Sequence, residues 1–310
     1  MVVTVTLNPA VDQTLFLDGL AVGEINRARA SQLDPAGKGI NVSRVVDRLG
    51  WPTVAFGFVA GEVGEIVRRA LDAEGVQQHF VTVPGQTRLN VHVVEEWQRQ
   101  ETSIHAPGPE IAQEHWRELH GLLDFWLRAA RVLVLAGSIP QGLPDTIYAD
   151  LVAEANRAGV KTILDADGEP LRLGVAAKPY LIKPNADEAA ALLGRPLTDL
   201  PAILAGAREL CNQGIRVVVI SMGAQGAICA EGKQAWRVTP PPVEAHSNVG
   251  SGDSLVAGLA VALSRDEPIL EGMRLGTAAG AATAMTPGTA LGTASEVQAL
   301  LPGVQVQELT

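Results

Sequence analysis

Short runs of Val, Ile and Leu alternate with amphipathic, helix-like stretches along most of this chain. The apolar runs lie at residues 2–7, 53–59, 131–137, 160–166, 180–185 and 217–223. Helical patterns fall at residues 116–130, 145–158, 186–194 and 201–213. Consecutive apolar positions are typical of strands that are covered on both faces in a parallel sheet. The alternation therefore predicts an α/β protein with three layers, in which helices cover both faces of a mostly parallel central sheet through right-handed crossovers.

Two further segments are strand-like but mixed in polarity. Residues 12–36 and 87–106 contain alternating patterns such as T-R-L-N-V-H-V-V-E-E, which are typical of strands with one exposed face. We expect them to form a half-exposed antiparallel flap, a small β-sheet lid over one end of the main sheet. Residues 227–239 are expected to form a hairpin at the edge of the main sheet. Because no fixed-period repeat or linker interrupts the pattern, the sequence predicts one domain over residues 1–310 that includes the lid segments.

The charge of the chain limits its partners. With 24 Lys and Arg against 34 Asp and Glu, the net charge is −10, which argues against a nucleic-acid-binding protein. A small anionic ligand is still compatible with this charge, because it needs only a local cluster of cations. Cys211 and Cys229 are too few for a disulfide framework or a cysteine zinc site. We expect a cytoplasmic protein without membrane contact, because the N-terminus lacks a signal-peptide pattern and the uncharged stretch 275–295 is too poor in large apolar residues for a membrane span.

Two G-x-G turns open amphipathic helices: Gly37-Lys38-Gly39 and Gly250-Ser251-Gly252. Neither turn completes a dinucleotide-binding or P-loop motif. The start of a helix presents unpaired N–H groups and a partial positive charge, so the two turns indicate two anion sites. A sharp strand-to-helix turn would account for each glycine pair equally well when that pair is considered alone.

Asp253 distinguishes the second turn from the first. An aspartate near a helix start is commonly a cap that contributes about 1 kcal/mol, but a cap does not require flanking glycines. Phosphoryl transfer requires N–H groups that hold the migrating phosphoryl charge and a carboxylate that accepts the proton of the acceptor hydroxyl. We therefore interpret Gly250, Ser251, Gly252 and Asp253 as catalytic, and we expect the helix dipole to keep Asp253 ionised.

A series of motifs extends this interpretation to the whole chain. In order they are N-P-A-V-D (8–12), G-K-G-I-N-V-S (37–43), K-P-N-A-D-E (183–188), S-M-G-A-Q-G (221–226) and V-G-S-G-D-S (249–254). Together they resemble the ribokinase-like sugar kinases of the phosphofructokinase-B type, and within that family the bacterial 1-phosphofructokinases, followed by the tagatose-6-phosphate kinases. The resemblance implies a ribokinase-like fold and a kinase that uses ATP and Mg²⁺ to phosphorylate the 6-hydroxyl of fructose 1-phosphate. Phosphorylation of tagatose 6-phosphate, or a non-catalytic sugar-phosphate sensor, are the alternatives.

The resemblance also implies a role for each matching residue. Asp253 corresponds to the catalytic base and the backbone of residues 250–252 to the anion hole. The residues expected to bind the sugar phosphate are Asp12, Arg27, Gly37, Lys38, Gly39, Asn41, Arg88 and Ser138. Those expected near the nucleotide are Lys183, Asn185, Ser221, Gly223, Gly226 and Gly280. Glu188 is expected to order Mg²⁺, mainly through water, because Mg²⁺ sheds its hydration shell reluctantly.

Basic residues in or beside the lid segments agree with an acceptor that already carries phosphate. Arg27, Arg29, Lys38 and Arg88 fall there, and the guanidinium fork matches phosphate oxygens bidentately. The alternative for each of them is a solvated surface charge, which is the favoured interpretation for Arg29 and the least expected one for Lys38, because Lys38 stands between two glycines.

The chain departs from the family pattern at two places, and its lid predicts a partner. His105 stands where these kinases more often carry Asn or Glu, and Ala166 and Asp167 replace Thr-Ser after the matching Asp165. Both departures could affect which sugar fits. The exposed strand edges of the lid predict a homodimer formed through the lid, because unpaired edges favour association.

Overall fold

The computed structural model describes residues 1–95, 97 and 100–310. The strands of the main sheet are β1 (Val2–Thr6), β4 (Thr53–Val59), β5 (Gln77–Thr82), β8 (Val132–Ala136), β9 (Lys161–Asp165), β10 (Leu181–Ile182), β11 (Val217–Ser221), β12 (Ala227–Glu231), β13 (Gln234–Thr239) and β14 (Gln305–Glu308). They form a ten-stranded sheet in the order β14-β13-β12-β11-β10-β9-β8-β1-β4-β5. Neighbours from β11 to β5 in this order are parallel, and the other three pairs are antiparallel. The predicted mostly parallel sheet is confirmed.

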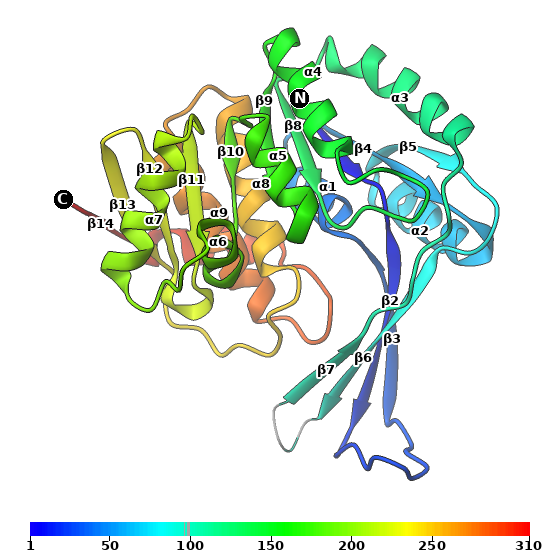
Figure 1. Cartoon of the computed structure of the whole chain (residues 1–310). Coiled ribbons are helices and arrows are strands. Elements are labelled where there is room, and N and C mark those ends of the chain that lie inside the picture. The colour runs from blue at the N-terminus through cyan, green and yellow to red at the C-terminus, as the bar shows by residue number, and fades with distance from the viewer. Residues whose placement is uncertain (96, 98–99) are drawn as a thin grey trace.

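Helices cover both faces of this sheet, so the predicted three layers are confirmed (Figure 1). One face is covered by α3 (Gln113–Leu127), α4 (Ile147–Ala158), α5 (Gly168–Ala176), α6 (Ala186–Leu193) and α7 (Leu200–Asn212). The other is covered by α1 (Lys38–Arg48), α2 (Gly61–Glu74), α8 (Ser251–Ser264), α9 (Ile269–Ala284) and α10 (Ala294–Leu300). The alternation of side chains explains the arrangement: in β8, Val132 and Val134 belong to the second core and Leu133 and Leu135 to the first. Strands buried on both faces therefore show the continuous apolar runs of the sequence.

The uncharged stretch 275–295 forms the end of α9, the loop that follows it and the first two residues of α10. A Cβ placed on Gly258 of α8 would lie 2.2 Å from the backbone nitrogen of Gly276 in α9, so the two helices contact each other through glycine. Small residues such as Gly276 therefore allow the two helices to pack closely. Among the helices of the described residues, none is long and apolar enough to cross a membrane.

A separate small sheet projects from the layered body (Figure 1). Its strands are β2 (Ala10–Leu17), β3 (Ala30–Ala36), β6 (Arg88–Glu95) and β7 (Gln100–Ile104), in the order β3-β2-β6-β7. The predicted flap is thus present, but the prediction that it is antiparallel is wrong for its central pair. β2 and β6 run parallel, because both strands leave the main body in the same direction.

Two other predictions need correction. The hairpin at residues 227–239 forms as β12 and β13, but it is not the edge of the sheet because β14 pairs with β13. The predicted strand at residues 180–185 is reduced to β10, of two residues, since Pro184 has no N–H to donate to a neighbouring strand.

Candidate active site

Gly250 sets the start of α8. Its φ of 77° lies in the left-handed region, which glycine adopts without strain, and a Cβ there would lie 2.8 Å from Leu291. No side chain caps the helix, so its first N–H groups remain available to an anion. At Gly252 a Cβ would meet only the Lys183 side chain, with its Nζ at 3.4 Å. The second glycine therefore leaves open backbone beside an ammonium group.

Asp253 lies in the first turn of α8 and is 7 % exposed. Its Oδ2 accepts a hydrogen bond of 2.8 Å from Nδ2 of Asn41, which α1 supplies. Burial, followed by the charge of Asp165, raises the pKa of Asp253 to about 6 despite the opposing effects of Lys38, Asn41 and Lys183. Burial therefore has a larger effect on this pKa than the helix start, although the expected ionised state at neutral pH still holds. At neutral pH the carboxylate is still mostly ionised and is a stronger base than an ordinary aspartate.

Asp165 joins two lysines that the sequence assigns to different ligands. It ends β9 and is buried, with Lys38 Nζ 3.0 Å from Oδ1 and Lys183 Nζ 3.3 Å from Oδ2. Burial alone would raise the pKa of Asp165, but Lys183 and Lys38 hold it below the usual value. Asp165 in turn raises the pKa of Lys38. Two fixed ammonium groups therefore flank the start of α8, in a chain of net charge −10.

A second cluster lies where the small sheet joins the body. Asn8 follows β1, and its backbone carbonyl accepts hydrogen bonds of 2.9 and 3.2 Å from the Arg88 guanidinium. Its side chain donates to Ser138 Oγ at 3.1 Å. In the small sheet, buried Asp12 accepts a 2.8 Å hydrogen bond from Asn90. Asn8 and Asn90 were not predicted as site residues from the sequence, although Asn8 lies in the N-P-A-V-D motif and Asn90 in the T-R-L-N-V segment.

The glycines around Lys38 have packing roles. A Cβ on Gly37, whose φ is 129°, would lie 2.7 Å from Thr6 Cγ2, and one on Gly39 would lie 2.4 Å from Thr6 Oγ1. The close approach of α1 to the end of β1 therefore explains both glycines. This agrees with the interpretation of a sharp strand-to-helix turn and does not require an anion site. Only Lys38 from this turn contributes a functional group to the cluster around Asp165.

The predicted nucleotide residues lie on two neighbouring segments. Ser221 donates its backbone N–H to the Pro184 carbonyl at 3.0 Å, which places the segment after β11 beside the one after β10. Asn185 and Glu188 form a reciprocal capping box at the start of α6. A Cβ added to Gly223 would have no atom within 4 Å, so a ligand could approach this glycine.

Packing explains the other two predicted nucleotide glycines. A Cβ on Gly226 would lie 2.0 Å from the Val238 carbonyl oxygen, and one on Gly280 would lie 2.9 Å from the Ser251 carbonyl oxygen. Their need for glycine therefore comes from the turn into β12 and from the contact between α9 and α8.

Most of these groups lie at the carboxyl ends of parallel strands. Asn8, Ser138, Asp165, Lys183 and Ser221 end or closely follow β1, β8, β9, β10 and β11. This edge is where ligands bind in open α/β sheets. Arg27 is the exception: it is exposed in the irregular segment between β2 and β3, and the chain does not bring it to the cluster. Arg29 of the same segment forms an ion pair with Asp18.

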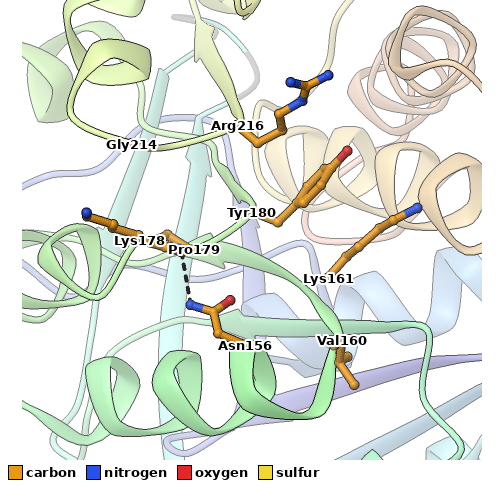
Figure 2. A pocket seen from close by; sticks show the side chains of 9 residues that line it. Asn156, Val160, Lys161, Lys178, Pro179, Tyr180, Gly214 and Arg216 are labelled. Carbon is orange, nitrogen blue, oxygen red and sulfur yellow. Dashed lines mark hydrogen bonds between the residues drawn. The ribbon is translucent and has the colours of Figure 1, made fainter.

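The opposite end of the sheet carries a hollow of about 370 Å³ between the starts of β9 and β11. Three basic residues line it, but their charged groups do not converge (Figure 2). Lys161 pairs with Asp266 at 2.7 Å and Arg216 with Glu231 at 3.1 Å, while Lys178 points to the opposite side from Lys161 (Figure 2). The hollow contains none of the predicted site residues, so the candidate active site is the carboxyl-end cluster.

Comparison with known proteins agrees with this geometry. Residues 5–296 match the pfkB family of carbohydrate kinases. A 1-phosphofructokinase from Xanthomonas campestris is 40 % identical over 87 % of this chain and 86 % of its own length. The 1-phosphofructokinase from Bacillus subtilis is 36 % identical over the full length of both chains. Phosphofructokinase-2 from Escherichia coli, solved with substrates and products, superposes with a TM-score of 0.91 at 31 % identity, covering 97 % of this chain and 98 % of its own. The chain belongs to the pfkB family of carbohydrate kinases.

Proposed function

We propose that this chain transfers the γ-phosphoryl group of ATP to the 6-hydroxyl of fructose 1-phosphate, forming fructose 1,6-bisphosphate and ADP. The observation that carries the proposal is Asp253, a buried carboxylate with a raised pKa at an uncapped helix start flanked by Lys38 and Lys183. Relatives over most of the chain carry the name 1-phosphofructokinase, which supports fructose 1-phosphate as the acceptor.

The residues suggest how the transfer proceeds. The bond between the sugar O6 and the γ-phosphorus forms while the bond from that phosphorus to the bridging oxygen of ADP breaks. Asp253 accepts the proton that O6 loses, late in the transfer because the transition state is loose. The N–H groups of residues 251–253 and the Lys183 ammonium stabilise the phosphoryl oxygens as they move. Each of these groups is in place before the substrate binds, so little reorganisation is needed.

The proposal includes Mg²⁺, which neutralises phosphate charge when it is bound. No group of three or more acidic, His or Cys side chains suited to a metal occurs among the described residues, so these residues do not supply a full ligand cage. This fits Mg²⁺, which usually keeps several waters and takes its other ligands from phosphates and one or two carboxylates. Glu188 is the residue that would hold Mg²⁺. The Asn185 N–H donates a 2.8 Å hydrogen bond to Glu188 Oε2, and this bond orients the carboxylate at the start of α6.

The sugar phosphate would lie between the two clusters. We propose that Asp12 accepts hydrogen bonds from sugar hydroxyls and that Arg88 and Lys38 contact the phosphate. The small sheet would then act as a lid, because Asp12 and Arg88 come from its strands. Production of ADP with fructose 1-phosphate, tagatose 6-phosphate and fructose 6-phosphate tests the assignment. Preference for fructose 1-phosphate by at least tenfold in kcat/KM supports it, preference for another sugar replaces the substrate, and sugar binding without ADP production would indicate a sensor.

We also propose that two chains pair through the lid. Its register places Leu33, Gln13, Val91 and Ile104 in one cross-strand row, on the face opposite to Asp12. Leu33 is 52 % and Ile104 is 60 % exposed, so this face is apolar and uncovered in one chain. Light scattering should give the mass of a dimer, and Ile104→Asp should give a monomer. A monomeric wild type at micromolar concentration would contradict the proposal.

A further inference from the structure

His92 lies between two carboxylates inside the lid. It is only 2 % exposed and stands in β6, between the strands that carry Asp12 and Glu101. Its Nε2 is 3.3 Å from Asp12 Oδ2, a charge pair without an aligned hydrogen bond. Its Nδ1 is 3.2 Å from Glu101 Oε1 and 2.9 Å from Ser103 Oγ. The imidazole thus contacts an acid on each side.

The protonation state decides whether both contacts are favourable. A neutral imidazole carries one N–H and can serve one of the two carboxylates, whereas an imidazolium carries two and can serve both. Burial alone would lower the pKa of His92, but Asp12 and Glu101 raise it to about 9. His92 is therefore a cation at neutral pH, and it separates two acids that would otherwise repel each other.

The contacts continue from the lid to the main body. The second oxygen of Glu101 accepts a 3.0 Å hydrogen bond from Ser247 Oγ. Ser247 stands three residues before Gly250, and its Oγ also accepts the Val249 N–H at 3.2 Å. At the other edge of the lid, Thr289 donates to Asp34 at 2.9 Å. Both edge strands of the lid are thus hydrogen-bonded to the body: β3 through Asp34, and β7 through Glu101, which also contacts His92.

We propose that His92 is a positioning residue that orients Asp12 toward the sugar and, through Glu101 and Ser247, fastens the lid to the loop leading into the catalytic helix. The identity of the sugar in this inference rests on the proposed function, but the contacts within the protein do not. If His92 lost its charge, Asp12 and Glu101 would repel each other across the ring. Either Asp12 would turn away from the sugar or Glu101 would release Ser247, and both changes weaken sugar binding.

Other polar groups around His92 do not replace this function. Asn90 donates to Asp12 and is neutral. The His105 ring lies 5.9 Å from that of His92, and burial, followed by the charges of Arg88 and His92, lowers its pKa, so His105 is neutral at pH 7. Arg88 donates to the Asn8 carbonyl. Within the described part of the lid, His92 is thus the cation that contacts both acids.

The sign of the pH effect follows from the raised pKa. Because the charged form is favoured in the folded lid, the contacts are complete at neutral pH and are lost as the pH rises through about 9. We therefore expect KM for fructose 1-phosphate to rise about tenfold between pH 8 and 10, the range for lost hydrogen bonds to charged groups, while KM for ATP changes less than twofold. His92→Gln should show the raised KM already at pH 7 and no further alkaline rise.

Two matched variants separate this effect from simple loss of structure. Glu101→Gln keeps an acceptor for Ser247 but removes one charge, so the alkaline rise in KM should move to lower pH. His92→Lys keeps a cation that does not titrate near pH 9, so it should restore the low KM and remove the rise up to pH 9.5. If KM and its pH profile in His92→Gln and Glu101→Gln equal those of the wild type, the proposal is overturned.

A measurement without substrate distinguishes failure of this inference from failure of the proposed function. The imidazole signals of His92 in the ligand-free protein should titrate with a midpoint near 9, and lower in Glu101→Gln. Amide hydrogen exchange in β7 and residues 246–249 should accelerate in His92→Gln. These results hold whichever sugar is the substrate. A midpoint near 6.5 with unchanged exchange would refute the inference even if fructose 1-phosphate is phosphorylated.

Discussion

The substitution Asp253→Asn should make the protein more stable and nearly inactive. A pKa of about 6 in place of 3.8 means that ionisation of this buried group costs the folded state about 3 kcal/mol at neutral pH. Asparagine does not ionise, so the cost disappears. The new amide also has partners, because Asn41 keeps one donor toward residue 253 and its own Oδ1 is buried without a partner in the described structure.

The pH dependence of this gain can be worked out from the same values. The protonated carboxyl is favoured in the folded state, so the cost of ionisation begins above pH 3.8 and is complete above about 6. Urea unfolding should therefore show Asp253→Asn more stable than the wild type by about 2–3 kcal/mol at pH 7 and by about half as much at pH 5. The exposed Asp145→Asn serves as the control and should change stability by less than about 0.5 kcal/mol.

The activity should change in the opposite direction. Loss of a general base typically lowers kcat by about 10²–10⁴, and KM for the sugar phosphate should change little because Asp253 acts on the reacting hydroxyl. In the wild type, kcat/KM should fall as the pH drops below about 6, when the base becomes protonated. If the Asp253→Asn enzyme kept more than a tenth of the wild-type kcat, or were less stable than the wild type at pH 7, Asp253 would not be a buried base.

Three further substitutions and one control address the surroundings of the site. Asp165→Asn leaves Lys38 and its companion lysine without their shared carboxylate, so urea unfolding should show a loss of about 3–5 kcal/mol; a loss below about 1 kcal/mol would contradict the shared ion pair. Arg88→Ala should raise KM for the sugar phosphate by an amount equivalent to about 1.5–3 kcal/mol, and an unchanged KM would place the phosphate elsewhere. Gly258→Ala should destabilise the contact between α8 and α9 by about 1–3 kcal/mol, whereas Gly121→Ala, which has open space on α3, should stabilise by about 0.5–1 kcal/mol; equal effects would refute the packing argument.

The sequence predicts the layers of the fold well because burial on both faces of a strand is visible in composition. The family resemblance also assigns Asp253, Lys38 and Lys183 to one site, and in the structure Lys183 follows a parallel strand at the edge of the sheet where ligands bind. The ion pairs of Lys38 and Lys183 with the same carboxylate, that of Asp165, could not be predicted. They depend on the adjacency of β9 and β10 and on side-chain rotamers. The alternation in residues 87–106 puts Asn90 and His92 on one face of a strand. It does not show that their side chains contact Asp12 and Glu101.

Pairings between distant segments were the weakest part of the prediction. Five elements, β3, α1, β4, α2 and β5, separate β2 from β6 in the chain, so the relative direction of these two strands depends on where both leave the body. An alternating pattern is the same for parallel and antiparallel neighbours, which is why the antiparallel expectation failed. The position of β14 outside β13 has the same cause, because the exposed residues of this short strand carry no apolar signal.

The position of β1 between β8 and β4 in the interior of the sheet has a consequence for biosynthesis. This strand leaves the ribosome well before its neighbours β4 and β8, which begin at Thr53 and Val132. About 130 residues must therefore be synthesised before β1 is enclosed on both sides, which at about 5–20 residues per second takes roughly 7 to 26 seconds. During that interval the nascent chain exposes an apolar segment with unpaired backbone groups, which makes it prone to aggregation.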